Sequence, residues 1–105
     1  MQATFERKSG ALRVTLQGDL IGGADAMSFS QSLKEWLTKS SESKLEEIAI
    51  NVAAVGFVNS SGLGMLLGAR QSATEAQAKF RIEAPQAQLK HLLSITKLSD
   101  LLGVV

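Results

Sequence analysis

The alternation of hydrophobic and polar residues near the N-terminus predicts a β-hairpin. Leu12, Val14 and Leu16 are separated by single polar residues, which is the period of a strand with one buried face. Residues 3–8, in which a phenylalanine is flanked by polar residues, predict a second short strand. The turn dipeptide Ser9-Gly10 lies between the two segments. We therefore expect two antiparallel strands, with residues 3–8 at the edge of a sheet.

Between residues 24 and 39, the interval between apolar residues becomes that of a helix. Four large apolar residues recur there at positions i, i+4, i+7 and i+8, namely Phe29, Leu33, Trp36 and Leu37. We expect this helix to pack on the sheet through these side chains. The polar run at residues 40–44 ends the helical pattern and predicts a surface connection to the next element.

The middle of the chain predicts a buried strand that leads into a helix. Ile48 and Ile50 lie on one face of a strand over residues 46–52, and the sequence stays nearly all apolar as far as Val58. Such a run is typical of a strand covered on both faces and of a buried loop after it. Asn59 and the two serines that follow it are favoured at helix N-termini, so a helix is expected to begin there.

The last third of the chain predicts one more strand and one more helix. Residues 79–83 alternate as a strand does, and Pro85 suits the first turn of a helix that carries three leucines. Residues 98–105 could form a short edge strand at the end. The resulting order, β-β-α-β-α-β-α, predicts an α/β layer fold in which right-handed crossovers join parallel strands.

Composition excludes several classes of function. The chain has 105 residues and is expected to form a single domain over residues 1–105. It has no cysteine and one histidine, which excludes disulfides, thiol catalysis and a multi-histidine metal site within one chain. The formal charge is +1 and the charges are scattered, which argues against nucleic acid or a membrane surface as partner.

No stretch approaches the ~18 apolar residues that would predict a membrane span. The N-terminal residues are charged and polar where a secretory signal needs an apolar run. We therefore expect a cytoplasmic protein without membrane insertion.

The segment Val58-Asn59-Ser60-Ser61-Gly62-Leu63-Gly64 carries the most informative chemistry. It joins a buried strand to a helix N-terminus, and the carboxyl ends of parallel strands are where ligands and partners usually bind. The free N–H groups and partial positive charge of a helix N-terminus would accommodate a phosphate on Ser60. On local sequence alone, a simpler interpretation stays open, in which Asn59 and the serines only cap the helix.

Three segments, taken in order, resemble the STAS domain of the anti-sigma factor antagonist family. They are GDLIGGADAM, then INVAAVGFVNSSGLGMLLGA, and then AP-x-x-x-L-x-x-LL-x-x-x-x-L. The second is the most specific, because NSSGLG follows a hydrophobic strand where the family has D-S-S/T-G-L-G. The likeness covers essentially the whole chain. It implies the STAS fold, a small mixed sheet of four to five strands with helices packed mainly on one face.

The resemblance also implies a partner-switching regulator rather than an enzyme, with no cofactor and no metal. Unphosphorylated family members bind an anti-sigma factor, a serine kinase of the histidine-kinase-like ATPase type, and so release a sigma factor or another target. The kinase phosphorylates the serine after the motif Asp, which corresponds to Ser60, and binding is lost. A PP2C-type phosphatase restores the unmodified form. A monomer is the expected state of a module that exchanges partners.

The partner-binding face implied by the motif combines two neighbouring turns. It comprises Asn59, Ser60, Ser61, Gly62, Leu63, Gly64, Met65 and Leu66, together with Gly22, Gly23 and Ala24 at the same edge of the sheet. The glycines after Ser61 would keep this surface low enough for a kinase to approach. An exposed methionine or leucine there would act as a contact anchor.

Asn59 departs from the family, which has Asp at this position. The amide keeps the shape of the side chain and an oxygen for capping, but it has no charge. Either the kinase accepts Asn, or Ser60 is phosphorylated poorly or not at all. The alternative function is that of a STAS subunit of a bacterial ABC lipid transporter, which binds the ATPase component through the same helix edge and does not depend on a charged Asp.

Overall fold

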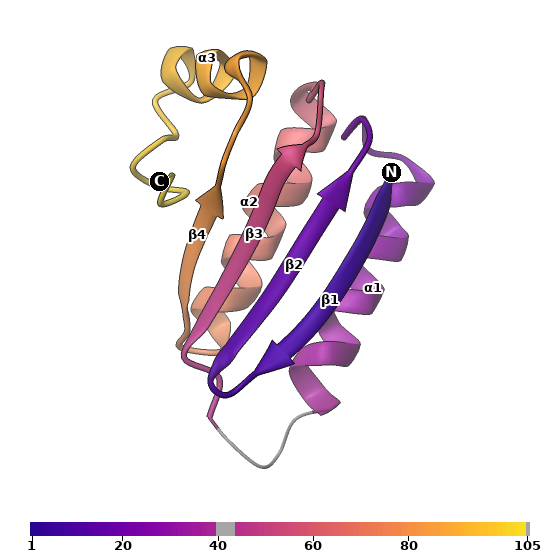
Figure 1. The fold of residues 1–105 in the computed structure, drawn as a ribbon, viewed down its shortest axis with the longest axis vertical. Helices are drawn as coiled ribbons and strands as arrows, with labels where there is room; N and C mark the ends of the chain where they lie inside the picture. Colours follow the sequence, from indigo (N-terminus) through magenta and orange to yellow (C-terminus); the bar gives the residue numbers. More distant parts are fainter. Residues whose placement is uncertain (40–43, 105) are drawn as a thin grey trace.

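The computed structural model describes residues 1–39 and 44–104, and these residues form the elements in the expected order. The hairpin is followed by alternating helices and strands: β1 (Gln2–Lys8), β2 (Ala11–Gln17), α1 (Ala24–Lys39), β3 (Glu47–Ala54), α2 (Ser60–Glu75), β4 (Lys79–Glu83) and α3 (Ala87–Ile95). The four strands form one sheet in the order β1-β2-β3-β4, shown in Figure 1. β1 is antiparallel to β2, whereas β2, β3 and β4 are parallel. The mixed α/β fold is thereby confirmed.

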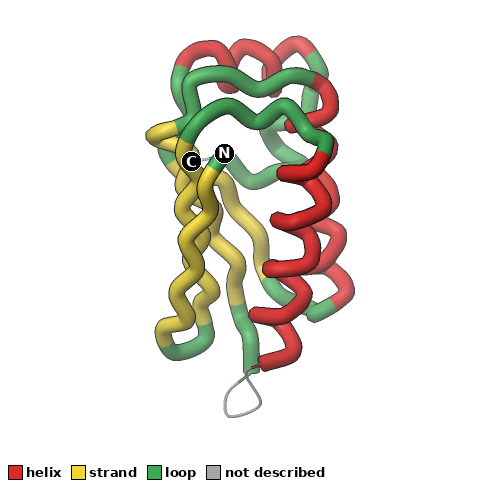
Figure 2. Tube along the Cα trace, turned by 90° about the vertical axis from the view of Figure 1, so that its right-hand side faces the viewer, coloured by secondary structure: helices red, strands yellow, loops and turns green. Residues whose placement is uncertain are grey.

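The helices α1 and α2 cover one face of the sheet, and α3 lies across the end at which β3 leads into α2 (Figures 1 and 2). The strand register places inward-facing residues in rows across the sheet. In one such row Val14, Ile50 and Ile82 lie side by side and are 1%, 0% and 0% exposed. These rows pack against the buried sides of the two helices, so that the core lies between the sheet and the helix layer.

The apolar stripe of α1 packs on the hairpin as its spacing predicts. Phe29 and Leu33 are buried in the core. The ring of Phe5 on β1 is stacked between two rings of α1, with centroid distances of 6.0 Å to both Phe29 and Trp36. These contacts fix α1 over β1, so that the edge strand is held by both β2 and a helix.

The prediction that β3 is covered on both faces is wrong. Ala53, Ala54 and Phe57 are exposed, and the buried residues at this end are Val52, Val55 and Val58. The reason lies in the crossovers. Two successive right-handed β-α-β units that advance in the same direction across a sheet place both helices on one side.

Charged and polar residues occupy the uncovered face. The guanidinium of Arg81 contacts the carboxylate of Glu83 at 2.7 Å and that of Glu47 at 3.2 Å. Ala49 is only 1% exposed although it lies on this face, and in the register it lies between Arg13 and Arg81. Long side chains on neighbouring strands can shield a small one in this way.

Two predicted boundaries shift at the C-terminal end. α3 begins at Ala87 after an N-cap at Gln86, so Pro85 precedes the helix instead of lying in its first turn. The final edge strand is limited to a single parallel bridge between Val104 and Ile82. Val105 and the polar residues 40–43 lie outside the described residues.

The connection from β2 to α1 makes a close backbone contact with the start of α2. Leu20 forms a parallel bridge with Val58, in which its N–H donates to the Phe57 carbonyl at 2.9 Å. The carbonyl of Leu20 accepts from the Asn59 N–H at 3.2 Å. A Cβ atom at Gly62 would overlap this same carbonyl oxygen, whereas a Cβ at Gly64 would meet nothing within 4 Å. The fold therefore requires glycine at position 62 but not at position 64.

We predict opposite effects on stability for the two glycines. Gly62→Ala should lower the free energy of unfolding by about 1–3 kcal/mol or more, because the Leu20 connection must move away from the helix. Gly64→Ala should raise it by about 0.5–1 kcal/mol, because alanine is favoured over glycine inside a helix. Urea unfolding of both variants beside the wild type measures the difference. Equal stability of the Gly62→Ala variant and the wild type would contradict the close contact.

Candidate functional site

The NSSGLG motif begins α2 at the carboxyl end of β3, and Asn59 is the N-cap, as predicted. Its backbone is extended, with φ −97° and ψ −176°, and its Oδ1 accepts a hydrogen bond from the Gly62 N–H at 2.8 Å. Its Nδ2 donates to the carbonyl of Ile21 at 3.4 Å. An aspartate carboxylate has acceptors only, so it could form the first of these bonds but not the second.

The two serines of the motif lie at the surface in the first turn of α2. Ser60 and Ser61 are exposed, and among the described residues neither hydroxyl has a hydrogen-bond partner. Ser61 packs against the turn before α1, where a Cβ at Gly22 would lie 2.6 Å from the Ser61 Cβ. Gly22 also has a φ of +85°, which favours glycine. The two turns therefore lie close together, and the Ser60 side chain is exposed to solvent.

Part of the predicted binding face belongs to the interior. Leu63, Met65 and Leu66 are 6%, 7% and 0% exposed, and Gly22 and Gly62 are also buried. The expectation that a methionine or leucine at these three positions projects as a contact anchor is wrong, because all three side chains are packed in the core. Met65 lies on the side of α2 that faces α1 and contributes to the groove between the two helices. Outward-facing positions that remain are half-buried Asn59 and exposed Ser60, Ser61, Gly64, Gly23 and Ala24.

Two exposed apolar residues, one in the β2–α1 connection and one in the first turn of α1, were not predicted. Ile21 is 54% exposed, and its carbonyl receives the Asn59 side chain. Met27 is 68% exposed and lies one helical turn before Ser30, which faces α2. Met27 lies off the stripe formed by Phe29 and Leu33, and this offset is the sequence signal that could have identified it.

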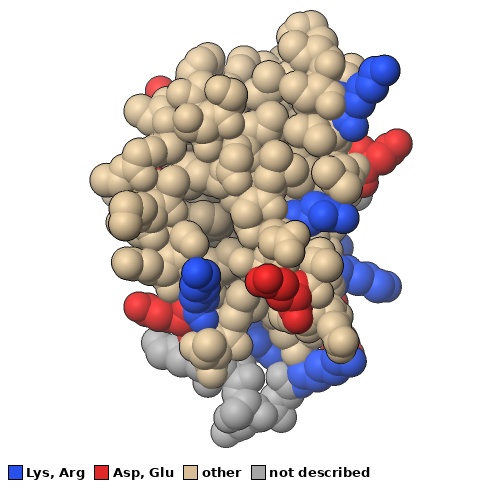
Figure 3. Space-filling model, turned by 180° about the vertical axis from the view of Figure 1, so that it is seen from behind, with Lys and Arg blue, Asp and Glu red and all other residues tan. Residues whose placement is uncertain are grey.

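The outer surface between α1 and α2 is a shallow groove without charged residues. The groove has a volume of about 240 Å³ and is lined by small and apolar residues: Ala26, Phe29, Ser30, Leu33, Ser61, Gly64, Met65, Gly68, Ala69 and Ser72. Residues 48–69 contain no Asp, Glu, Lys, Arg or His. Viewed from the helix side, the charged side chains gather toward the lower part and one edge, and most of the remaining surface is uncharged (Figure 3).

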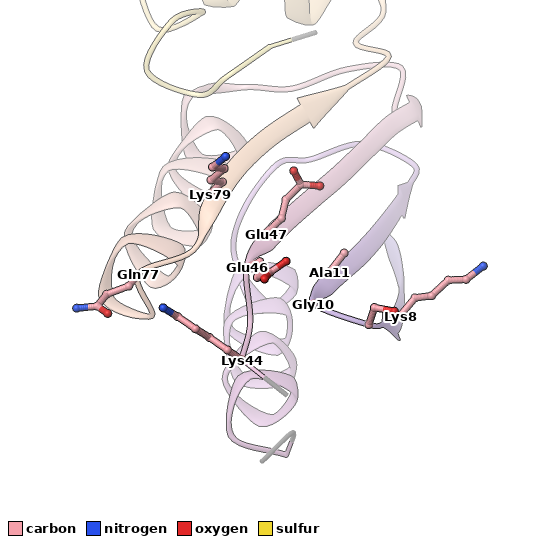
Figure 4. Close-up of a pocket in the computed structure, with 9 residues that line it drawn as sticks. Lys8, Gly10, Ala11, Lys44, Glu46, Glu47, Gln77 and Lys79 are labelled. Carbon is pink, nitrogen blue, oxygen red and sulfur yellow. The ribbon is translucent and has the colours of Figure 1, made fainter. Parts of the chain in front are cut away.

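A larger hollow of about 660 Å³ lies at the opposite end of the sheet, where β3 and β4 begin. Figure 4 shows lysines and glutamates from several segments around it, among them Lys44, Lys79, Glu46 and Glu47. These charges are mixed in sign, and Glu47 is already paired with Arg81. Ligands of parallel sheets bind at the carboxyl ends of the strands, so the Ser60 end is the better candidate.

Metal-ligand groups and membrane-spanning helices also bear on function. Within residues 1–39 and 44–104, no three His, Cys, Asp or Glu side chains are grouped as a metal ion requires. In the same part of the chain, no helix has the length and hydrophobicity needed to cross a membrane.

The fold is similar to those of several solved structures. An anti-sigma factor antagonist from Mycobacterium paratuberculosis aligns with a TM-score of 0.77 at 17% identity, over 98% of this chain and 83% of the other. The phosphorylated form of the Bacillus cell fate determinant SpoIIAA gives 0.73 at 14% identity, over 99% and 91%. A sulfate transporter family protein from Wolinella succinogenes gives 0.69 at 15% identity, over 90% and 75%.

At these identities the likeness establishes the fold and leaves the partner open. A comparison with curated protein sequences gives no significant match. The profile of the STAS domain, by contrast, matches residues 2–105, which is nearly the whole chain. With the mixed sheet, the one-sided helix layer and the NSSGLG motif at the start of α2, this match shows that the chain belongs to the STAS domain family.

Proposed function

We propose that this protein is an anti-sigma factor antagonist of a bacterial partner-switching pathway, and not an enzyme. The unphosphorylated form binds a serine-kinase anti-sigma factor with a histidine-kinase-like ATPase domain, and the sequestered sigma factor or other target is released. The kinase then phosphorylates Ser60, binding is lost, and a PP2C-type phosphatase removes the phosphate. The observation that carries the proposal is the exposed Ser60 hydroxyl in the first turn of α2, inside the NSSGLG motif.

A phosphate on Ser60 changes the charge of this surface without requiring a change of fold. Phosphoserine carries about −1.5 to −2 charges at pH 7, and a helix N-terminus tolerates that charge. The segment around Ser60, residues 48–69, has no charge of its own. A partner surface that fits an uncharged face would have to desolvate or repel the phosphate, and both are unfavourable.

The proposed contact face has a small-residue centre and an apolar rim. Ser60, Ser61 and Gly64 form the centre on α2, where no long side chain keeps a partner away from the helix. We assign to the rim the exposed apolar side chains of Ile21, whose carbonyl receives the Asn59 amide, and of Met27 in the first turn of α1. Flexible apolar side chains, methionine in particular, often contribute to protein-binding surfaces.

A second candidate function is that of a STAS subunit in a bacterial ABC lipid transporter, in which the same face binds the ATPase component. The observation that favours it is Asn59. This residue is neutral where the antagonist family has Asp, and its amide is used in hydrogen bonds to both Gly62 and Ile21. The NSSGLG motif favours the antagonist.

Affinity capture with the tagged wild-type protein, from the cells that express it, separates the two functions. Recovery of a small histidine-kinase-like ATPase supports the antagonist, and mass analysis of the same sample tests for phosphate on Ser60. Recovery of an ABC ATPase with its permease would instead establish the transporter subunit. A kinase bound to protein that is never phosphorylated on Ser60 would identify Asn59 as a barrier to phosphorylation.

Ser60→Asp should abolish binding of the captured kinase, with an affinity loss of about a hundredfold or more. The added carboxylate lies in the centre of the proposed face, whereas the free energy of unfolding should change by less than about 1 kcal/mol because the side chain is exposed. Ser60→Asn, which is nearly isosteric and neutral, is the matched control and should retain binding. Titration calorimetry and urea unfolding provide the two measurements. Unfolding of the Ser60→Asp variant would contradict a surface position for Ser60.

Met27→Lys should weaken kinase binding by about tenfold or more, because a desolvated ammonium group would replace an apolar contact. Stability should be nearly unchanged, since Met27 is 68% exposed. The control is Thr4→Lys, which adds the same charge to an exposed position on the uncovered face of the sheet. Equal affinities of the two variants would place Met27 outside the interface.

A further inference from the structure

The side-chain amide of Gln88 in α3 forms two hydrogen bonds with the backbone of Val58. The Val58 N–H donates to Oε1 at 2.9 Å, and Nε2 donates to the Val58 carbonyl at 3.0 Å. Both bonds are partly buried and join residues 30 positions apart. One side chain thus satisfies both polar groups of the backbone immediately before the motif.

This amide takes the place of a neighbouring strand. On one side, the segment from Phe57 to Asn59 is bonded to the backbone of Leu20. On the other side, the pairing of β3 with β4 ends at Asn51 and Glu83, because the chain then turns toward α3 (Figure 1). A primary amide has both a donor and an acceptor, as a peptide group does. Gln88 can therefore form the backbone hydrogen bonds that a neighbouring strand would form, at a point where β4 no longer pairs with the chain that follows β3.

A second glutamine of the same helix end provides a comparison. Nε2 of Gln86 donates to the carbonyl of Ala53 at 2.7 Å. This single bond is exposed and lies before the loop, seven residues from Ser60. Gln88, in contrast, holds the residue after which Asn59 caps α2 and Ser60 begins it.

We infer that Gln88 is a positioning residue for Ser60, and that it holds the start of α2 in the orientation which the partner recognises. This inference rests on the proposed function. Without the amide, the N–H and carbonyl of Val58 would be left without protein partners in a largely buried place, which backbone groups avoid. The segment would then open toward water on this side. Only its bonds to Leu20 and Ile21 would remain, so Asn59 and Ser60 would be positioned less firmly.

Gln88→Leu removes both hydrogen bonds and keeps a side chain of similar volume. We expect amide hydrogen exchange of Val58, followed by NMR, to accelerate by about tenfold to a hundredfold. We also expect the affinity for the kinase that the wild type captures to fall by about tenfold. Gln86→Leu, the matched control, should leave the Val58 exchange rate and the affinity within about twofold of the wild type.

A conservative variant adds a readout that a general loss of stability would not produce. Gln88→Glu should show fast Val58 exchange at neutral pH, because its carboxylate cannot donate to the Val58 carbonyl. At a pH below the ordinary pKa of a glutamic acid side chain, the protonated group regains one donor and one acceptor, and protection relative to the wild type at the same pH should return.

Unchanged Val58 exchange in the Gln88→Leu variant would overturn the inference, because the bonds would then not hold the segment. Faster exchange with wild-type affinity and a wild-type rate of Ser60 phosphorylation would also overturn it, because Gln88 would then have no effect on the partner. These failures appear in the comparison of variant and wild type. Failure of the proposed function appears in the wild type itself, as the absence of a bound kinase.

Discussion

The site depends on the backbone contact between Leu20 and the start of α2. Leu20 pairs with Val58, accepts a hydrogen bond from Asn59 and lies against Gly62. No side chain separates the two segments at this point. The orientation of the first helical turn is therefore set by peptide groups, which are rigid, and Ser60 is exposed to solvent while the backbone beneath it is held in place.

This arrangement gives α2 one face that is buried in the core and one face that is exposed at the candidate site. The inward side contributes Leu66 and Ala69 to the core, so the helix is anchored by hydrophobic burial. The outward side of its first turns has small, uncharged residues, among them Ser60, Ser61 and Gly64. Under the proposed function, such a surface would gain binding energy from close approach and from desolvation of a neutral face, and a phosphate on Ser60 would oppose both.

Asn59 connects two segments of the candidate site. Its amide caps α2 and also reaches the Ile21 carbonyl, so it fastens the β2–α1 turn to the helix. With Gln88 on the other side of Val58, two uncharged side chains hold the segment that precedes Ser60. The STAS fold itself occurs in an anti-sigma factor antagonist and in a sulfate transporter family protein. The fold alone therefore does not decide the partner.

The sequence alone determined the elements, because their signals are local. The alternation from Leu12 to Leu16, the helical spacing from Phe29 to Leu37 and the capping residue Asn59 each act within one or two turns of chain. These signals predicted the hairpin, α1 and the start of α2, and they placed Ser60 at the carboxyl end of a parallel strand. The start of α3 predicted from Pro85 is two residues too early, because the backbone of Gln86 is still extended.

The tertiary structure decided which of these residues face solvent and which meet across the chain. The direction of the two crossovers left one face of β3 uncovered, so Ala53 and Phe57 are exposed despite their apolar surroundings in sequence. The same packing turned Met65 inward and left Met27 outside. The two glycines of the motif look alike in sequence. A Cβ at Gly62 would overlap the Leu20 carbonyl, whereas a Cβ at Gly64 would meet nothing within 4 Å. Contacts of this kind join residues some 30 or 40 positions apart, and local periodicity contains no information about them.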